Sequence, residues 1–393
     1  MTTTDLSIQN LLALVDRDRL RDTLFDMVRI PSPTGDTRTF AEHVAHLLRE
    51  SSLADVGLID TPDWPDSPAV VAWRRGRGRG PTLQFSGHLD HIHQPHAAPT
   101  IAGDRIYGRG AADMKSGLAC MVEVARVLDT AGIELPGDLL FTAHDLHEAP
   151  VGYGEGLRSL LCLGIVGDAV IVTEGPSDAF HIAGKSQSVF EITLTLPGDP
   201  IHELAVSPET PNLVELGAEV ISALTQLRTR IAQRCDEVLG PETLFLGQIA
   251  AGDFYNRLPT VCRIVGTWRY PPETTRDAVA AELHEVVLST VEDRPVCVSV
   301  DGSQGNEGFR VSLDEPIAQA LHAAYHQVTG SPLANGVQLF AADNGKFINW
   351  AHVPAVAHGV GLSQAHADIE WCDAADLERL AKVLLATTVE YYS

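Results

Sequence analysis

Short apolar runs alternate with amphipathic segments between residues 69 and 175, and this alternation limits the possible folds more than any other feature of the chain. The runs have the length and β-branched content of strands, and they cover residues 69–76, 82–88, 138–145 and 168–175. Between them, residues 114–132 have helical spacing and end at Gly132. Strands that alternate with helices predict a layered α/β domain.

The residues before this alternation are predicted to add two helices. Residues 9–30 have helical spacing, PSPTGD at 31–36 interrupts the pattern, and a second helix is expected from Thr37 onward. The N-terminus has no basic segment followed by an apolar block, as a signal peptide would. No apolar run approaches the roughly 20 residues of a membrane-spanning helix. We therefore expect a cytoplasmic protein without a membrane partner.

A different pattern begins near residue 184. Strands are expected at 188–198, 262–272 and 294–302, and helices at 211–233 and 275–291. That β-α-β-α-β order is typical of a small α+β domain. The helix–strand rhythm resumes at about residue 304. We expect an outer domain made of residues 1–183 and 303–393, with residues 184–302 inserted as a second domain.

The composition excludes some classes of partner and site. Of the 393 residues, 45% are hydrophobic and 20% are charged, as in ordinary globular proteins, and the net charge is −24. Nucleic acid is not expected as a partner, because binding phosphates requires a basic surface. The six cysteines are scattered and include no C-x-x-C pair, so we expect reduced and mostly buried thiols.

Residues with the chemistry of metal ligands follow the predicted strands. His88 and Asp90 lie in SGHLD at a strand end, and Glu174 ends another apolar run. Asp113 precedes a helix in GRGAADMKSGLA, where an N-cap is the alternative role, and His366 follows a glycine-rich loop. Imidazole and carboxylate groups suit a divalent metal, and α/β enzymes place their sites at the carboxyl edge of the sheet.

The stretch HDLHEAP at residues 144–150 contains His144, Asp145, His147 and Glu148. These side chains are consistent with metal ligands, with a catalytic base, or with four polar residues on a solvated loop. The stretch alone does not separate these interpretations.

The motif order does add a further constraint. The sequence resembles the acetylornithine deacetylase / succinyl-diaminopimelate desuccinylase / aminoacylase / glutamate carboxypeptidase family in the order of its motifs. These are H-x-D, G-R-G-x-x-D-M-K-x-G, the 147–148 position, E-G-P and A-H-x-x-x-E. The resemblance covers nearly the whole chain. It implies an α/β/α sandwich with a mixed sheet, a ferredoxin-like lid and dimerisation domain, and a homodimer. It also implies hydrolysis of an N-acyl amino acid or small peptide-like amide that carries a free carboxylate.

Family members usually hold two zinc ions, and the resemblance assigns a ligand to each motif. His88 and Glu174 would bind the first ion, Glu148 and His366 the second, and Asp113 would bridge both. Oxygen and nitrogen ligands without thiolate suit zinc, although cobalt or manganese fit such a site too. Two such ions can share a hydroxide and polarise a carbonyl.

Other roles are also implied by the resemblance. Asp90 would orient His88. His202 matches a histidine that reaches the partner's active site and stabilises the developing oxyanion. Asn256 and Arg269 match residues that hold the substrate carboxylate, a task that suits the planar fork of arginine; a turn residue and a surface arginine are the alternatives.

The chain departs from the family at its catalytic base. The family has two adjacent glutamates, the first a general base and the second a ligand, whereas this chain has His147 and Glu148. His147 is therefore the candidate base. Alternatively, His147 binds metal and Asp145 is the base, or the protein binds metal and ligand without hydrolysing an amide.

Extra histidines also distinguish the chain. His91, His93 and His96 follow the first motif, and His358 precedes the last. We expect them in loops or pocket walls rather than as ligands.

Overall fold

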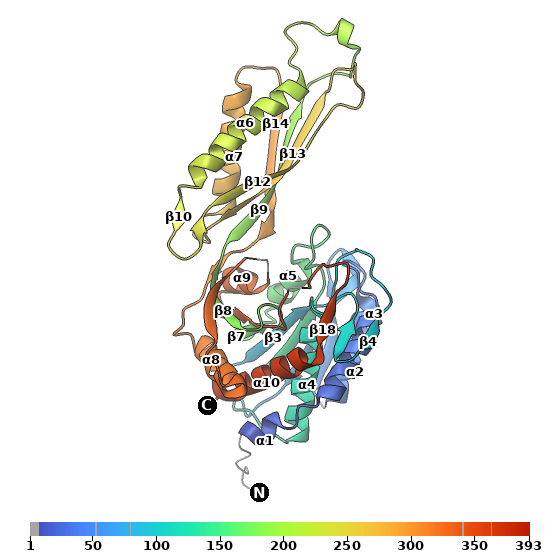
Figure 1. Ribbon diagram of the computed structural model, residues 1–393, viewed down its shortest axis with the longest axis vertical. Coiled ribbons are helices and arrows are strands. Elements are labelled where there is room, and N and C mark those ends of the chain that lie inside the picture. Colours follow the sequence, from blue (N-terminus) through green and yellow to red (C-terminus); the bar gives the residue numbers. More distant parts are fainter. Residues whose placement is uncertain (1–7, 52, 79, 340–341, 363) are drawn as a thin grey trace. The chain divides into compact units, whose positions relative to one another are not determined.

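The computed structural model describes residues 8–51, 53–78, 80–339, 342–362 and 364–393. The chain forms two compact units (Figure 1). The first unit comprises Met1–Ile182, Val311–Gly336 and Ala341–Ser393, and the second comprises Ala183–Arg310 and Val337–Phe340. The domain limits expected from the sequence, 1–183, 184–302 and 303–393, stay a prediction. No described helix has both the length and the apolar character that crossing a membrane requires.

The first unit is built on a six-stranded mixed sheet with the order β1-β2-β6-β3-β7-β17. β6, β3, β7 and β17 are parallel neighbours, whereas β1 and β2 are antiparallel to their neighbours. β3, β6 and β7 are buried along their whole length, as expected for parallel strands covered on both faces. The strands are β1 Ala54–Thr61, β2 Trp64–Arg74, β3 Leu83–His88, β6 Leu139–His144, β7 Ala169–Val172 and β17 Ala355–Ala357.

Helices cover both faces of this sheet (Figure 1). On one face, Leu157 and Leu160 of α5 and Phe347 join clusters with apolar residues of β2, β6, β7 and β17. On the other face, α4 and α10 pack against each other and against α2 and α8. The bounds are α2 Arg17–Val28, α3 Arg38–Glu50, α4 Lys115–Thr130, α5 Glu155–Cys162, α8 Pro316–Thr329, α9 Asn344–Lys346, a π-helical turn Phe347–Ala351, and α10 Ala374–Tyr391.

The prediction of a single helix over residues 9–30 is wrong. α1 spans only Ile8–Leu12, and α2 begins at Arg17. Asp16 separates them, because it is extended and its side chain accepts a hydrogen bond from the Arg19 backbone N–H as an N-cap. The other helices of this unit that the sequence predicts, from Thr37 and over 114–132, are confirmed.

Two small sheets are formed by short strands. β4 Thr100–Ala102, β5 Arg105–Tyr107 and β18 Trp371–Asp373 form one small sheet. β8 Ala179–Gly184, β15 Phe309–Arg310 and β16 Ala334–Gln338 form another, at residues where the chain passes from one unit to the other.

The second unit is a four-stranded antiparallel sheet with α6 and α7 on one face (Figure 1). Its chain order is β9, α6, β12, β13, α7, β14, and its sheet order is β12-β13-β9-β14, which is the ferredoxin-like arrangement. The edge strand β12 was not predicted from the sequence, because most of its residues are exposed and lack the burial alternation of β9. The bounds are β9 Ser186–Thr195, a 3₁₀ turn Glu203–Ala205, α6 Leu213–Ile231, β10 Cys235–Asp236, β11 Gly240–Pro241, β12 Thr243–Ala251, β13 Val261–Tyr270, α7 Arg276–Val291 and β14 Cys297–Asn306.

The cysteines are free thiols, as expected, but the prediction that most are buried is wrong. Three are buried and three are exposed. The exposed ones lie at element ends or edges: Cys162 ends α5, Cys235 begins a short hairpin strand, and Cys297 begins the edge strand β14.

Candidate active site

The candidate metal ligands of the first unit converge at one edge of the mixed sheet. His88 ends β3, and Glu174 lies two residues after the end of β7. These parallel strands are neighbours, so their carboxyl ends meet at the same edge. Asp113 and Glu148 come from loops and contact His88 and His366 there. The fold thus brings the five candidate ligands together.

Asp113 lies between two histidines. Its Oδ1 is 3.1 Å from Nε2 of His88, and its Oδ2 is 3.3 Å from Nε2 of His366. Glu148 contributes Oε1 at 3.0 Å from the same His366 nitrogen. The N-cap role considered for Asp113 is wrong, because Met114 occupies the N-cap of α4 without a side-chain cap. The two oxygens of Asp113 are instead arranged like those of a bridging carboxylate.

The donor chemistry of this cluster fits divalent metal ions. Ligand-type atoms of His88, Asp113 and Glu148 lie within 4.8 Å of one another, and so do those of His88, His147 and Glu174. Glu174 Oε2 is buried and has no hydrogen-bond partner among the described residues. Burial and the nearby Asp113 carboxylate raise the pKa of Glu174 to about 8. A buried carboxylate so placed is better satisfied by a cation than by the surrounding protein.

Charge pairing holds the second histidine of the cluster. Hydrogen bonds that His366 donates to the Asp113 and Glu148 carboxylates raise its pKa to about 10. The His366 side chain is about half exposed, at 52%. The site is therefore buried around Asp113 and Glu148 and open at His366.

Asp90 supports the cluster in two ways. Its backbone oxygen is 2.9 Å from His88 Nδ1, so the imidazole donates there and directs Nε2 toward Asp113. Its carboxylate accepts hydrogen bonds from the backbone N–H groups of His147 and Glu148. The Asp90 carboxylate itself lies 3.6 Å from His88 Nδ1, so it holds the 147–148 turn more directly than it holds the imidazole.

His147 stacks on His88, with ring centroids 4.1 Å apart and an interplanar angle of 1°. Its Nδ1 is 3.1 Å from Oδ2 of Asp343. Asp145 is turned to other partners: its carboxylate accepts from Gly35, Thr37 and Leu146. This engagement makes His147 the better placed of the two candidate bases.

Two supporting acids were not predicted from the sequence. Glu370 accepts hydrogen bonds from the backbone N–H groups of Ala112 and Asp113 and pairs with Arg109 at 3.0 Å. Glu370 is the acid of the A-H-x-x-x-E motif, which was a usable signal. Asp343 carries no comparable signal, because the residues that it contacts at 144 and 147 are almost 200 positions away.

The extra histidines lie outside the ligand groups found among the described residues. His91 Nε2 accepts from the Ser32 backbone N–H, and His96 Nε2 accepts from the Glu370 backbone N–H. His93 Nε2 donates to the Thr34 carbonyl. His358 is fully buried. His91, His93 and His96 thus anchor loops.

The second unit brings two of its three candidates together. Asn256 Nδ2 lies 3.2 Å from Nε2 of His202. Arg269 lies at the opposite end of β13, and its side chain forms no ion pair or hydrogen bond with any described residue. Val261 and Arg269 are eight residues apart on this strand, or roughly 26 Å at about 3.3 Å per residue.

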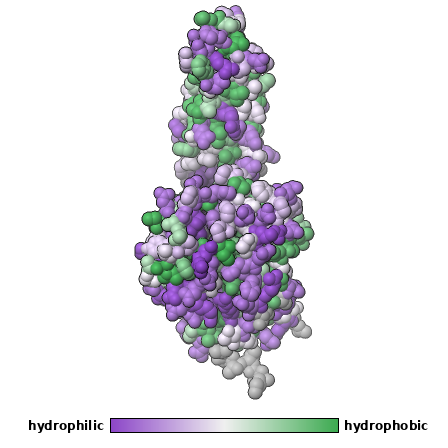
Figure 2. Space-filling model, turned by 90° about the vertical axis from the view of Figure 1, so that its right-hand side faces the viewer, coloured by the Kyte–Doolittle hydropathy of each residue, from purple (hydrophilic) through white to green (hydrophobic). Residues whose placement is uncertain are grey.

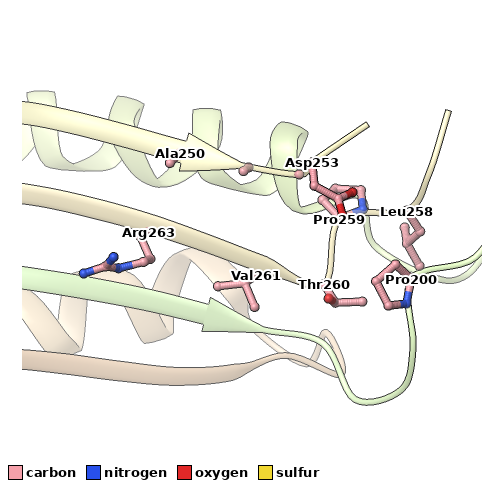
Figure 3. A pocket seen from close by; sticks show the side chains of 10 residues that line it. Pro200, Ala250, Asp253, Leu258, Pro259, Thr260, Val261 and Arg263 are labelled. Atoms are coloured by element: carbon pink, nitrogen blue, oxygen red, sulfur yellow. The ribbon is translucent and has the colours of Figure 1, made fainter. Parts of the chain in front are cut away.

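A separate pocket of about 310 Å³ lies near the His202 end of the second unit (Figure 3). Pro200, Leu258 and Pro259 line it, and Asp253 and Arg263 are its charged residues. Its lining has one carboxylate, that of Asp253, and no histidine or cysteine. Figure 2 shows one face of the molecule, on which hydrophobic residues appear in small groups among hydrophilic ones.

Known proteins share this sequence pattern and fold. The chain is 25% identical to a succinyl-diaminopimelate desuccinylase from Sulfurovum sp. (strain NBC37-1), over 80% of this chain and 84% of that one. It is 36% identical to the desuccinylase of Methylobacterium radiotolerans, but there the match spans only 33% of this chain and 35% of the relative.

Solved structures have the same fold. A tripeptidase from Staphylococcus aureus subsp. aureus mu50 has a TM-score of 0.79 at 22% identity, over 97% of this chain and all of that chain. A dinuclear metal-binding peptidase from Bacillus subtilis has a TM-score of 0.69 at 16% identity, over 96% and 98% of the two chains. Residues 84–390 match the model of Peptidase family M20/M25/M40. The chain is therefore a member of this family of hydrolases that act on amide and peptide bonds.

Proposed function

We propose that this protein is a metal-dependent hydrolase that cleaves the amide bond of an N-acyl amino acid, or of a small peptide-like molecule, that carries a free carboxylate. The observation that carries the proposal is the position of Asp113 between His88 and His366, with one carboxylate oxygen toward each imidazole. A carboxylate in this position can hold two cations at once, as in two-metal hydrolases.

The geometry supports the two sets of ligands that we propose. His88, Glu174 and one Asp113 oxygen would hold the first ion, and Glu148, His366 and the other Asp113 oxygen would hold the second. Zinc suits these ligands, and cobalt or manganese also fits. Bound there, two divalent ions would supply Lewis-acid activation of a water molecule and of the scissile carbonyl.

The proton transfers are assigned to His147. Its Nε2 would accept a proton from the attacking water and pass it to the amine nitrogen as the C–N bond breaks. The Asp145 carboxylate is less suited, because its contacts with Gly35, Thr37 and Leu146 occupy it. A member that binds without hydrolysing is not favoured, since every ligand position of the family is filled.

We assign the substrate carboxylate to Arg269, with Asn256 as a second contact, and the developing oxyanion to His202. A small substrate does not span the roughly 26 Å between the two ends of β13. His202 and Asn256 therefore serve a different site from the Arg269 of the same chain. A homodimer with shared sites satisfies this requirement, and we expect it to be cytoplasmic.

Measuring bound metal and turnover on the same preparation tests the proposal. Protein purified without chelator should contain about two divalent ions per chain. It should hydrolyse at least one class in a panel of N-acetyl, N-succinyl and N-carbamoyl amino acids and dipeptides. Protein that holds two ions per chain but turns over no member of the panel would overturn the proposed function.

A further inference from the structure

A buried hydrogen-bond network joins His147 to Asp343, a residue without a role in the mechanism proposed above. Asp343 immediately precedes α9 and is 1% exposed. Its Oδ2 lies 2.7 Å from Nε2 of His144 and 3.1 Å from Nδ1 of His147, and its Oδ1 lies 2.8 Å from Nζ of Lys346. One carboxylate thus faces three donors, all in the first unit.

The carboxylate of Asp343 is held in its charged form. Burial alone would favour the neutral acid, but His147, Lys346 and His144 together hold its pKa well below the usual range. The Lys346 stem passes close to Gly154, where an added Cβ would lie 2.9 Å from the Lys346 Cε. A charged carboxylate only accepts hydrogen bonds, so each ring nitrogen that faces it carries a proton.

This restriction decides which nitrogen of His147 is available. Nδ1 of His147 faces Asp343, so in the neutral ring the lone pair is on Nε2. His147 also belongs to the ligand-type group with His88 and Glu174, whose atoms lie within 4.8 Å of one another. Because Nδ1 is used by Asp343, Nε2 is the nitrogen left for that group.

We propose that Asp343 is a positioning residue that fixes His147 in its Nδ1–H form and directs the Nε2 lone pair toward the ligand set. The inference rests on the proposed function and extends it: a histidine–aspartate pair does the work of the glutamate that the family has at position 147. The Nε2 atom takes one proton from water as the water oxygen bonds to the amide carbon. The same proton passes to the amine nitrogen as the C–N bond breaks, and the Nδ1 proton stays on His147 throughout.

Asp343→Asn tests this assignment, because it keeps the shape of the side chain and removes its charge. The asparagine amide can donate to Nδ1 of His147, which would move the ring proton to Nε2 and remove the lone pair from the site. We expect kcat to fall by about 10²–10⁴-fold, the range for general-base catalysis, with KM and bound metal within about threefold of wild type. Asp343→Glu, which keeps the charge, should recover part of kcat. Asp168→Asn is the matched control, since Asp168 accepts a hydrogen bond from the Thr82 backbone in the same unit, away from the ligand set.

A double-mutant cycle separates positioning from a general loss of stability. If Asp343 acts through His147, adding Asp343→Asn to His147→Gln should cost almost nothing further in kcat. Losses that multiply would overturn the inference.

Nitrogen-15 NMR of the metal-loaded protein gives a readout that does not depend on activity. The His147 signals are those missing from His147→Gln, and in wild type the proton should be on Nδ1. A proton on Nε2 in wild type would overturn the inference even if Asp343→Asn does not fold. If wild type turns over no panel substrate, the proposed function fails, while the tautomer still decides the role of Asp343.

Discussion

The two units of the chain bury different kinds of residue. The first unit buries Asp90, Asp113, Glu148, Glu174 and Asp343, each at most 7% exposed, beside apolar strands. The second unit has a core of apolar residues from β9, β13, α6 and α7, and its candidates His202, Asn256 and Arg269 are exposed or partly exposed.

This difference shows where the chemistry is preorganised. Burying several carboxylates is unfavourable unless each has a hydrogen-bond partner or a cation. The first unit supplies such partners from its own residues, including Arg109 for Glu370 and Lys346 for Asp343. The second unit leaves His202, Asn256 and Arg269 exposed or partly exposed, as expected of residues that meet a substrate or a neighbouring subunit.

The largest expected effect comes from removing the centre of the buried cluster. Asp113→Ala removes the proposed bridge between the two ions, so we expect both to be lost and turnover to fall by more than about 10⁴-fold. Metal analysis and a turnover assay check this, with Asp168→Asn as the control. Full metal content and activity in Asp113→Ala would show that the buried cluster is structural.

A smaller effect is expected at His147, which borders the cluster but is not assigned as a ligand. His147→Ala should keep its metal and lose about 10²–10⁴-fold in turnover, the usual size of a general-base contribution. His147→Glu should retain measurable activity, because it restores the family's side chain. If Asp145→Ala is inactive while His147→Ala is active, the assignment of the base is wrong.

These two predictions differ in how far the sequence supports them. His88, Asp113 and Glu174 could be proposed as ligands from the sequence, because each lies beside a recognisable strand or helix end. The support of His147 by Asp343 could not, because the contact joins residues 196 positions apart and depends on how the loops pack. The break between α1 and α2 and the edge strand β12 were missed for a related reason: one N-cap and an exposed edge leave little periodic signal.

Arg269 tests the second unit. If it grips the substrate carboxylate, Arg269→Ala should cost about 2–5 kcal/mol in transition-state binding, measured as kcat/KM. A substrate amidated at that carboxylate should lose a similar amount with wild type. The two losses should not add when combined, since they remove the same contact. Additive losses would indicate that Arg269 is structural.

Mixing inactive variants tests whether the second unit serves a neighbouring chain. His202→Ala and Glu148→Ala affect different units, so one of the two sites in a hybrid dimer would have both residues intact. At equal mixing, half of the dimers are hybrids, and roughly a quarter of wild-type activity should return. Each variant alone is the control. Absence of recovery, with subunit exchange proven by a tagged chain, would argue against shared sites.

The smallest effect is expected from His91, a neutral histidine that borders the buried cluster. Its Nε2 accepts from the Ser32 backbone N–H, which requires the unprotonated nitrogen. Burial lowers its pKa from 6.5 to about 4; Lys115 and Arg109 add to this shift, and Asp90 opposes it. Because the unfolded chain binds the proton more tightly, this stability is present above pH 6.5 and is lost as the pH falls toward 4.

The His91 contribution can be isolated by comparison with His91→Gln, which has no titrating group at this position. Between pH 7.5 and pH 5, the free energy of unfolding of wild type should fall by about 2 kcal/mol more than that of the variant. Denaturant titrations at both pH values measure this, with chelator present throughout so that release of metal does not contribute. Equal pH dependence in the two proteins would mean that His91 is already free to take up a proton in the folded state. The hydrogen bond between the Ser32 backbone and His91 would then not contribute to the stability of the first unit.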